Sequence, residues 1–232
     1  MRNLCIIPAR GGSKRIPRKN IKDFLGKPII AYSIEAALKS GLFDEVMVST
    51  DDEEIAEIAI QYGAKVPFMR SDEKANDVAT TYEVIEEVIQ CYMDKGQSFE
   101  NACCIYPCAP FISIDKLKEA HKKLDQFNAV FPIVQYGFPI QRALKKDGRD
   151  KIDFIQPEFA LSRSQDLDAS FHDAGQFYWL NIKKLIENKS IMSNNTGCVV
   201  LSEMEVQDID NEIDWQLAEL KFKLNNDISK TI

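Results

Sequence analysis

The chain has 232 residues, a net charge of −7, 45% hydrophobic residues and 28% charged residues, which suits one globular α/β domain. The acidic balance argues against nucleic acid as the main partner, because proteins that bind nucleic acid usually carry a basic surface. No stretch approaches the roughly 18 apolar residues of a membrane-spanning helix, so we expect no membrane partner. The first residue leads directly into an apolar run without a signal-peptide pattern, which predicts a cytoplasmic protein.

Strand-like and helix-like segments alternate from residue 3 to residue 134, which predicts a mostly parallel sheet covered by helices on both faces. Residues 175–180 and 198–201 continue the strand pattern, 206–210 form a short edge segment, and a last helix closes the domain before a frayed end at 225–232. The expected early strands are 4–7, 45–49, 65–69, 102–106 and 129–134. The expected helices are about 28–39, 50–62, 78–95, 113–126 and 213–224.

The alternation stops near Gln135. Residues 136–172 contain Gly, Pro, Arg and Asp without a helical period, and short apolar runs flank Asp147-Gly148. This pattern predicts a hairpin-like arm inserted into the domain. The residues themselves indicate only an extended insertion outside the core.

Positive charge is concentrated after the first strand. Residues 1–30 contain eight lysines and arginines but a single acid, Asp23. Gly11-Gly12 allows a tight turn that presents backbone N–H groups, and neighbouring cations can then screen several phosphates. The loop matches neither the Walker motif nor the dinucleotide fingerprint. A solvated basic loop is the ordinary reading of such a run, but α/β folds bind ligands after their strands, so we interpret the loop as an anion site.

Two carboxylates are the second candidate element. In an extended segment, residues i and i+2 project from the same face, so Asp208 and Asp210 can approach one site while Ile209 turns into the core. Two carboxylates suit Mg²⁺, which completes its coordination with phosphates and water. The alternative is a solvated acidic loop, and the basic loop in the same chain favours the metal.

The six cysteines form no CxxC pair, and the two histidines do not complete a zinc pattern. Cys5, Cys103 and Cys104 lie in apolar runs and are expected in the core. Cys108 follows a predicted strand, where an alkylatable thiol without a catalytic role is expected.

Residues 9–20, Ala-Arg-Gly-Gly-Ser-Lys-Arg-Ile-Pro-Arg-Lys-Asn, resemble the signature loop of the acylneuraminate cytidylyltransferases. Members of that family transfer CMP from CTP to nine-carbon acidic sugars. Gln207-Asp208-Ile209-Asp210 is similar to the family's magnesium motif, and the resemblance extends from residue 3 to about 222. It implies a single Rossmann-like nucleotidyltransferase domain over 1–232, with the arm at about 136–172 serving to form a homodimer and reach the partner's active site.

The resemblance also implies roles for individual residues. Arg10, Lys14 and Lys19 would stabilise charge on the triphosphate and pyrophosphate, and Asp208 and Asp210 would hold Mg²⁺. The implied contacts to CTP come from Ala9, Arg10, Gly11, Gly12, Ser13, Lys14, Lys19, Asn20, Arg70, Asp77, Thr80 and Thr81. Within this set Asp77 holds the shape of its loop or simply caps a helix.

The downstream half looks like the branch of the family that acts on pseudaminic acid. Arg142 and Arg163 suit the carboxylate of an acidic sugar, and Tyr106 stands where the family usually has a Gln that contacts the sugar. Sialic, legionaminic and 3-deoxy-octulosonic acids remain alternatives, as does a nucleotide-binding regulator without catalysis. The candidate sugar-binding residues are Tyr106, Gln141, Arg142, Arg163, Gln165, His172, Gln176 and Tyr178.

Overall fold

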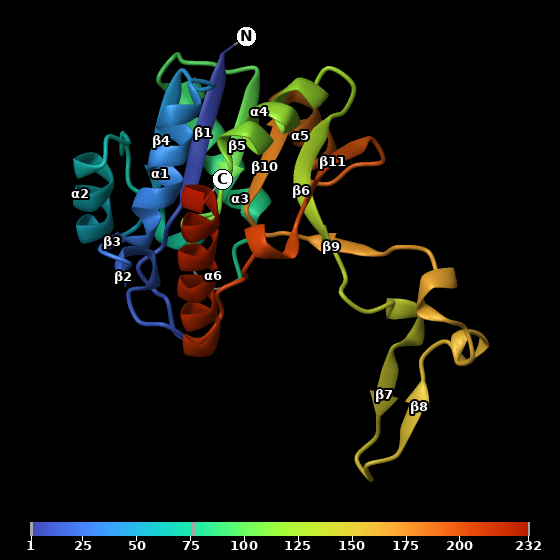
Figure 1. The fold of residues 1–232 in the computed structure, drawn as a ribbon. Coiled ribbons are helices and arrows are strands. Elements are labelled where there is room, and N and C mark those ends of the chain that lie inside the picture. Colours follow the sequence, from blue (N-terminus) through green and yellow to red (C-terminus); the bar gives the residue numbers. More distant parts are fainter. Residues whose placement is uncertain (1, 76–77, 232) are drawn as a thin grey trace.

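A seven-stranded sheet forms the centre of the protein (Figure 1). The computed structural model describes residues 2–75 and 78–231, and side chains up to residue 225. The strand order is β11-β6-β10-β5-β1-β4, with β9 beside β6. The strands of this sheet are β1 (Asn3–Pro8), β4 (Glu45–Ser49), β5 (Asn101–Ile105), β6 (Ala129–Gln135), β9 (Phe171–Asp173), β10 (Phe177–Asn181) and β11 (Thr196–Leu201).

Most strands of the sheet run in one direction. β1 is parallel to both β4 and β5, and β11 is parallel to β6. β10 lies antiparallel between β5 and β6, so β6 runs with β5, and β9 is also antiparallel to β6. Five of the seven strands therefore share a direction, which confirms the expected mostly parallel sheet. The segments that follow β1, β4 and β5 consequently meet at one edge.

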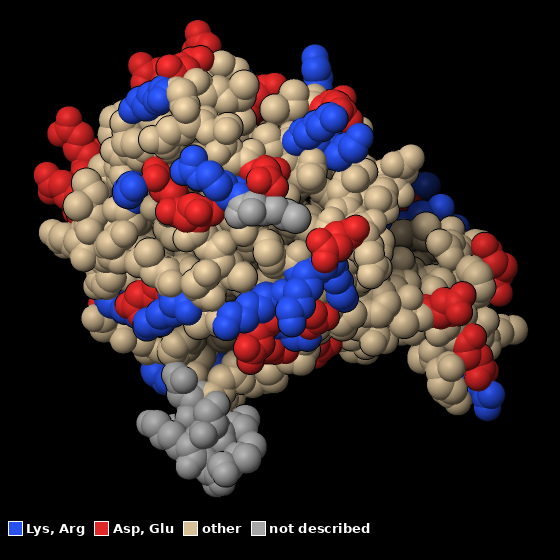
Figure 2. All heavy atoms as spheres, turned by 90° about the horizontal axis from the view of Figure 1, so that it is seen from above, with Lys and Arg blue, Asp and Glu red and all other residues tan. Residues whose placement is uncertain are grey.

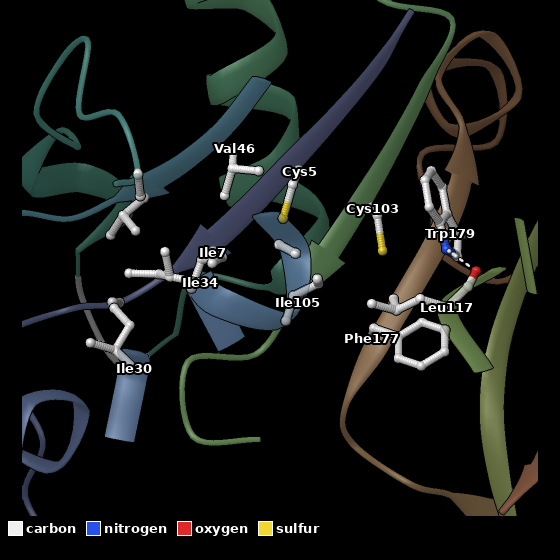
Figure 3. Packing of buried hydrophobic residues seen from close by; sticks show 14 of the residues in the cluster. Cys5, Ile7, Ile30, Ile34, Val46, Cys103, Ile105, Leu117, Phe177 and Trp179 are labelled. Carbon is white, nitrogen blue, oxygen red and sulfur yellow. Dashed lines mark hydrogen bonds between the residues drawn. The ribbon is translucent and has the colours of Figure 1, made fainter. Parts of the chain in front are cut away.

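Helices cover both faces of the sheet because successive side chains along each strand point to opposite sides. On β1, Cys5 and Ile7 pack in one cluster with α1, α2 and α4, as Figure 3 shows in part. Leu4 and Ile6 pack in the other cluster with α3 and α5. The helices are α1 (Ile29–Ser40), α2 (Glu53–Gln61), α3 (Thr81–Asp94), α4 (Ile114–Lys123), α5 (Ile182–Asn188) and α6 (Glu212–Thr231).

The last helix lies beside the loop that follows β1. Trp215 and Ala218 of α6 share a buried cluster with Ile16 and Phe24 of the loop region and with Ile209. Two further short strands, β2 (Asp23–Phe24) and β3 (Lys27–Pro28), pair in an antiparallel turn just before α1. This cluster brings residues near both ends of the chain to the same edge of the sheet.

The predicted arm is a hairpin that projects from the sheet (Figure 1). Its strands, β7 (Leu144–Lys146) and β8 (Ile152–Phe154), pair antiparallel. The end of the expected arm differs, because Phe171 and His172 lie in β9 and pair with Gln135 and Val134 of β6.

Several expected element boundaries were wrong. The strand expected at 65–69 reduces to an isolated bridge between Lys65 and Met47, just before Pro67, which has no N–H donor. No ladder forms at 206–210. The helix expected from 78 begins at Thr81, since Thr80 and Glu83 form a capping box there. The tail expected to fray continues α6 to Thr231, and α5 was not predicted.

Charge is mixed on the end of the molecule away from the basic loop. Figure 2 views this end from above, and blue and red side chains are interspersed over the part that the structure describes. Among the residues that the structure describes, no helix is both long enough and hydrophobic enough to cross a membrane.

Candidate active site

The candidate site is built where parallel strands end. The basic loop follows β1, Thr50-Asp51-Asp52 follows β4, and Tyr106-Pro107-Cys108 follows β5. A parallel arrangement places these three segments at one edge, as α/β folds do at their ligand sites.

Polar contacts fix the backbone of the basic loop. The Gly11 N–H donates to the Asp51 carboxylate at 2.9 Å, and the Asn20 amide donates to the Arg10 carbonyl at 2.9 Å. The Cys108 thiol in turn donates to the Asn20 side-chain oxygen at 3.2 Å. Asn20 is 5% exposed and holds the two ends of the loop together, and it also lines the smaller of the two cavities described below, so its predicted contact to the nucleotide stays a prediction.

Arg18 clamps the far side of the loop to the start of α2. Its guanidinium pairs with the carboxylates of Asp52 and Glu54, although its own backbone has a φ of +55°. The Arg18 guanidinium holds the pKa of the Asp52 carboxyl below its ordinary value. A non-glycine residue in the left-handed region costs about 1–2 kcal/mol, so these ion pairs offset a local strain.

The acid segment lies next to the loop, as predicted. Ile209 is 2% exposed in the cluster under α6, while Asp208 and Asp210 face outward. Partial enclosure of the Asp208 carboxyl, together with the nearby Asp210 charge, raises the pKa of Asp208. Asp210 pairs with Arg15 at 2.7 Å. The Asp214 carboxylate accepts from the N–H groups of Asp210 and Asn211, so it fixes the start of α6.

Two cavities adjoin at Asp208. The smaller, about 210 Å³, is lined by Arg10, Ser13 and Lys19 of the basic loop and by Cys108. The larger, about 370 Å³, lies toward β6 and β9. Gly175, Gln207 and Asp208 line both. A ligand in one cavity can therefore approach a ligand in the other beside a carboxylate.

The expected Mg²⁺ fits the chemistry of these donors, since carboxylate oxygens are ligands that Mg²⁺ prefers. Asp208 lines the basic cavity, whereas Asp210, two residues further on, pairs with Arg15. The described residues contain no cluster of three or more His, Cys, Asp or Glu arranged to hold a metal. A metal bound here would thus take a substantial share of its ligands from phosphates and water.

The expected CTP contacts Arg70, Thr80 and Thr81 do not line either cavity. Arg70 is buried and donates to the Ser49 hydroxyl at 3.0 Å and the Ser49 carbonyl at 2.6 Å, and burial lowers its pKa. The Thr80 hydroxyl caps α3. The Thr81 hydroxyl lies 3.0 Å from the Tyr106 hydroxyl. Asp77 lies outside the described residues.

The eight expected sugar-binding residues are not gathered within one chain. Tyr106 lines the smaller cavity and His172 the larger. Gln176 is 4% exposed and donates to the Glu205 carbonyl, so it supports the cavity wall instead of facing it. The buried Tyr178 hydroxyl donates to Asp173 at 2.6 Å.

The remaining four lie in the arm. Gln141 donates to the Asp168 carbonyl at 2.9 Å, and Arg163 pairs with Asp166. Gln165 lines a separate cavity between parts of the arm, and Arg142 ends a short 3-10 turn. These four residues therefore do not line either of the two cavities of their own chain, and their expected contact to the sugar stays a prediction.

The sequence analysis missed several residues at the edge of the sheet where the candidate site lies. Asp51 and Asp52 hold the basic loop, and the rule that parallel strands end together would have pointed to them after β4. Asp173 and Lys221 line the larger cavity. Asp173 stood in the segment 172–178 that resembles the pseudaminic acid branch but was given no role, and Lys221 had no motif signal.

Comparison with known proteins indicates a cytidylyltransferase, the class that the sequence motifs predicted. The family model described as cytidylyltransferase matches residues 4–146. The chain is 44% identical to the pseudaminic acid cytidylyltransferase of Campylobacter jejuni serotype O:2 over 98% of this chain and 99% of that protein. It is 33% identical to the CMP-N,N'-diacetyllegionaminic acid synthase of Legionella pneumophila, again over 98% and 99%.

The fold has a counterpart among solved structures. A CMP:2-keto-3-deoxy-manno-octonic acid synthetase complexed with CTP aligns with a TM-score of 0.69 at 17% identity, covering 98% of this chain and 100% of that one. The protein belongs to the cytidylyltransferase family. Within it, the resemblance to the acylneuraminate cytidylyltransferases is confirmed, and the pseudaminic acid enzymes are among its similar relatives.

Proposed function

We propose that this enzyme transfers CMP from CTP to the anomeric hydroxyl of pseudaminic acid and releases pyrophosphate. The observation that carries the proposal is the position of Asp208, which lines both the basic cavity and the larger cavity beside it. The basic cavity suits the triphosphate and the larger one the sugar. The 44% identity to a pseudaminic acid cytidylyltransferase along nearly the whole of both chains supports this choice of sugar.

In the reaction, the anomeric oxygen attacks the α-phosphorus, forming a P–O bond while the bond to the β-phosphate breaks and the hydroxyl proton is released. Catalysis rests on positioning and charge neutralisation. Arg10, Lys14 and Lys19 stabilise charge on the phosphates and the departing pyrophosphate. Asp208 and Asp210 hold Mg²⁺, which when bound neutralises phosphate charge and orients the triphosphate.

The arm is assigned to a homodimer. Neither Arg142 nor Arg163 lines the larger cavity of its own chain, and both are exposed. A second copy would bring guanidinium groups to the sugar carboxylate. Sedimentation that finds only monomer at micromolar concentration overturns this assignment.

The test of the function is pyrophosphate release with CTP and Mg²⁺ across a panel of pseudaminic, legionaminic, sialic and 3-deoxy-octulosonic acids, with UTP and ATP as nucleotide controls. Release that is strongest with CTP and pseudaminic acid is the expected result. Release only with another acidic sugar replaces the substrate and keeps the reaction. Absence of pyrophosphate release with every sugar overturns the proposal.

A further inference from the structure

Asp173 occupies a position in the larger cavity that the sequence motifs did not assign. It is the last residue of β9, and it lines the cavity together with His172, Gly175 and Asp208. The residue is exposed, although Ala174 directly after it is 4% exposed. A carboxylate therefore stands at the cavity wall on a short strand anchored in the sheet.

Two hydrogen bonds hold that carboxylate. One oxygen accepts from the Tyr178 hydroxyl at 2.6 Å, and the other accepts from the Gly175 N–H at 2.8 Å. Tyr178 is 3% exposed and sits in β10, which pairs with both β5 and β6. Gly175 has a φ of +62°, a conformation that glycine adopts without strain and that lets the chain turn back on Asp173.

The donor on the buried side stays protonated. Burial raises the pKa of Tyr178 far above its ordinary value, with Tyr106 and Asp173 adding to the shift. The ring of Tyr106 meets the ring of Tyr178 edge-on at 5.4 Å. Asp173 is thus fixed from behind by a rigid aromatic pair, and each of its oxygens keeps a lone pair for a ligand.

The chemistry of this wall is selective for hydrogen-bond donors. A fixed carboxylate attracts N–H and O–H groups and repels a carboxylate, so it decides which side of an acidic sugar faces it. Basic groups among the cavity's lining residues come from His172 and Lys221. Lys221 already donates to the carbonyls of Glu203 and Val206 at 3.0 and 2.8 Å.

We propose that Asp173 determines acceptor specificity by accepting a hydrogen bond from an acylamino N–H of the sugar, and that Tyr178 is the positioning residue that holds it. This inference rests on the proposed function. It explains why a chain whose cavity wall is acidic can select an acidic substrate: donor groups face Asp173 and the sugar carboxylate is turned away. Acceptors without acylamino groups, such as 3-deoxy-octulosonic acid, lose part of this recognition.

The test compares wild type with Asp173→Asn, Tyr178→Phe and a matched control, Asp125→Asn. Asp125 is an exposed acid between α4 and β6, outside both cavities. Steady-state kinetics are measured for CTP and for two acceptors, pseudaminic acid and 3-deoxy-octulosonic acid, with thermal melting and calorimetric CTP binding on each variant.

In Asp173→Asn, we expect the KM for pseudaminic acid to rise about 10- to 100-fold, the range for a lost hydrogen bond to a charged group, while CTP binding is unchanged. The preference for pseudaminic acid over the octulosonic acid should shrink by a similar factor. Tyr178→Phe keeps the carboxylate and should show the same pattern more weakly. Asp125→Asn should match wild type.

Three outcomes overturn the inference. An unchanged KM for pseudaminic acid in Asp173→Asn shows that Asp173 makes no hydrogen bond to the sugar. If Asp173→Asn weakens the use of both acceptors and the binding of CTP equally and lowers the melting temperature, Asp173 has only a structural role. A wild-type enzyme that releases no pyrophosphate with any acidic sugar overturns both the proposed function and this inference. An active wild type whose sugar KM is unchanged by Asp173→Asn overturns the inference alone.

Discussion

The Lys19 ammonium lies 2.8 Å from the backbone carbonyl of Ile209, a contact that joins residues 190 positions apart in the chain. It ties the basic loop to the acid segment, between the two carboxylates assigned to the metal. Lys22 adds a second tie, donating to both oxygens of Glu212 at 2.8 Å. The cations and the carboxylates of the candidate site are thereby held as one unit before any ligand binds.

The two glycines of the basic loop should respond differently to alanine. A Cβ at Gly11 would lie 2.7 Å from an Asp52 carboxylate oxygen and 3.0 Å from the Asp52 Cβ, whereas a Cβ at Gly12 meets nothing within 4 Å. Gly11→Ala should therefore destabilise the fold by about 1–3 kcal/mol and lower the melting temperature. Gly12→Ala should melt like wild type.

The same pair locates the triphosphate. If the open space beside Gly12 receives phosphate, Gly12→Ala should weaken CTP binding by about tenfold, or about 1.4 kcal/mol, without a change in stability. Calorimetric titration with CTP measures this directly. A Gly12→Ala protein with wild-type affinity would place the triphosphate elsewhere in the loop.

The Arg18 clamp should be needed for loop geometry. Arg18→Ala loses both ion pairs and keeps a non-glycine residue at φ +55°. We expect a stability loss of about 1 kcal/mol or less from the partly exposed pairs, together with a raised KM for CTP. Arg18→Gly removes the pairs but relieves the backbone, so it should be the more stable of the two. Arg149→Ala, on the exposed hairpin turn, is the control and should change neither quantity.

The fold could be predicted largely because its signals are local. Alternating strand and helix patterns and the Gly41 and Gly63 helix ends lie within a few residues of what they specify, and these predictions were mostly confirmed. The site was harder. Side-chain chemistry suggested that Tyr178 binds sugar, but β10 lies in the middle of the sheet and is buried on both faces, so Tyr178 packs in the core and its hydroxyl donates to Asp173.

The arm shows a second limit of prediction from sequence, which is the direction in which an insertion points. Its composition predicted a hairpin correctly, yet nothing in Gln141, Arg142 or Arg163 encodes the direction in which the hairpin points. That direction depends on where β6 ends and β9 returns to it. Long-range pairings of this kind have no sequence period to detect.

Cys108 should be a poor nucleophile in spite of its place beside the basic cavity. Burial raises the pKa of its thiol to about 12, with Lys19 only partly opposing the shift. The group therefore stays a neutral thiol near neutral pH, and it donates to Asn20. The expected alkylation of this thiol without a catalytic role should thus be slow.

Iodoacetamide labelling at pH 8, followed by peptide mass spectrometry, checks this. The exposed Cys198 should be modified first, and the half-buried Cys108 much more slowly, because its raised pKa leaves little reactive thiolate. Cys108→Ser, which keeps a donor for Asn20, should retain CTP binding better than Cys108→Val. Rapid labelling of Cys108 in the folded protein would contradict the protonated thiol.

Asp210 provides the sharpest test of the metal assignment. Its carboxylate is partly exposed and pairs with Arg15, while its backbone N–H is held by Asp214 independently of the side chain. Asp210→Ala should therefore keep the fold and its melting temperature, and yet nearly abolish pyrophosphate release, because a single carboxylate binds a divalent cation poorly. Asp125→Ala, which removes an exposed acid outside both cavities, is the control and should retain most of the turnover. Manganese titration followed by electron paramagnetic resonance supplies a readout independent of turnover: affinity should fall in Asp210→Ala and persist in Asp125→Ala. Near-normal turnover or metal affinity in Asp210→Ala would remove Asp210 from the metal site and leave the ion, if one is used, to Asp208 and the phosphates.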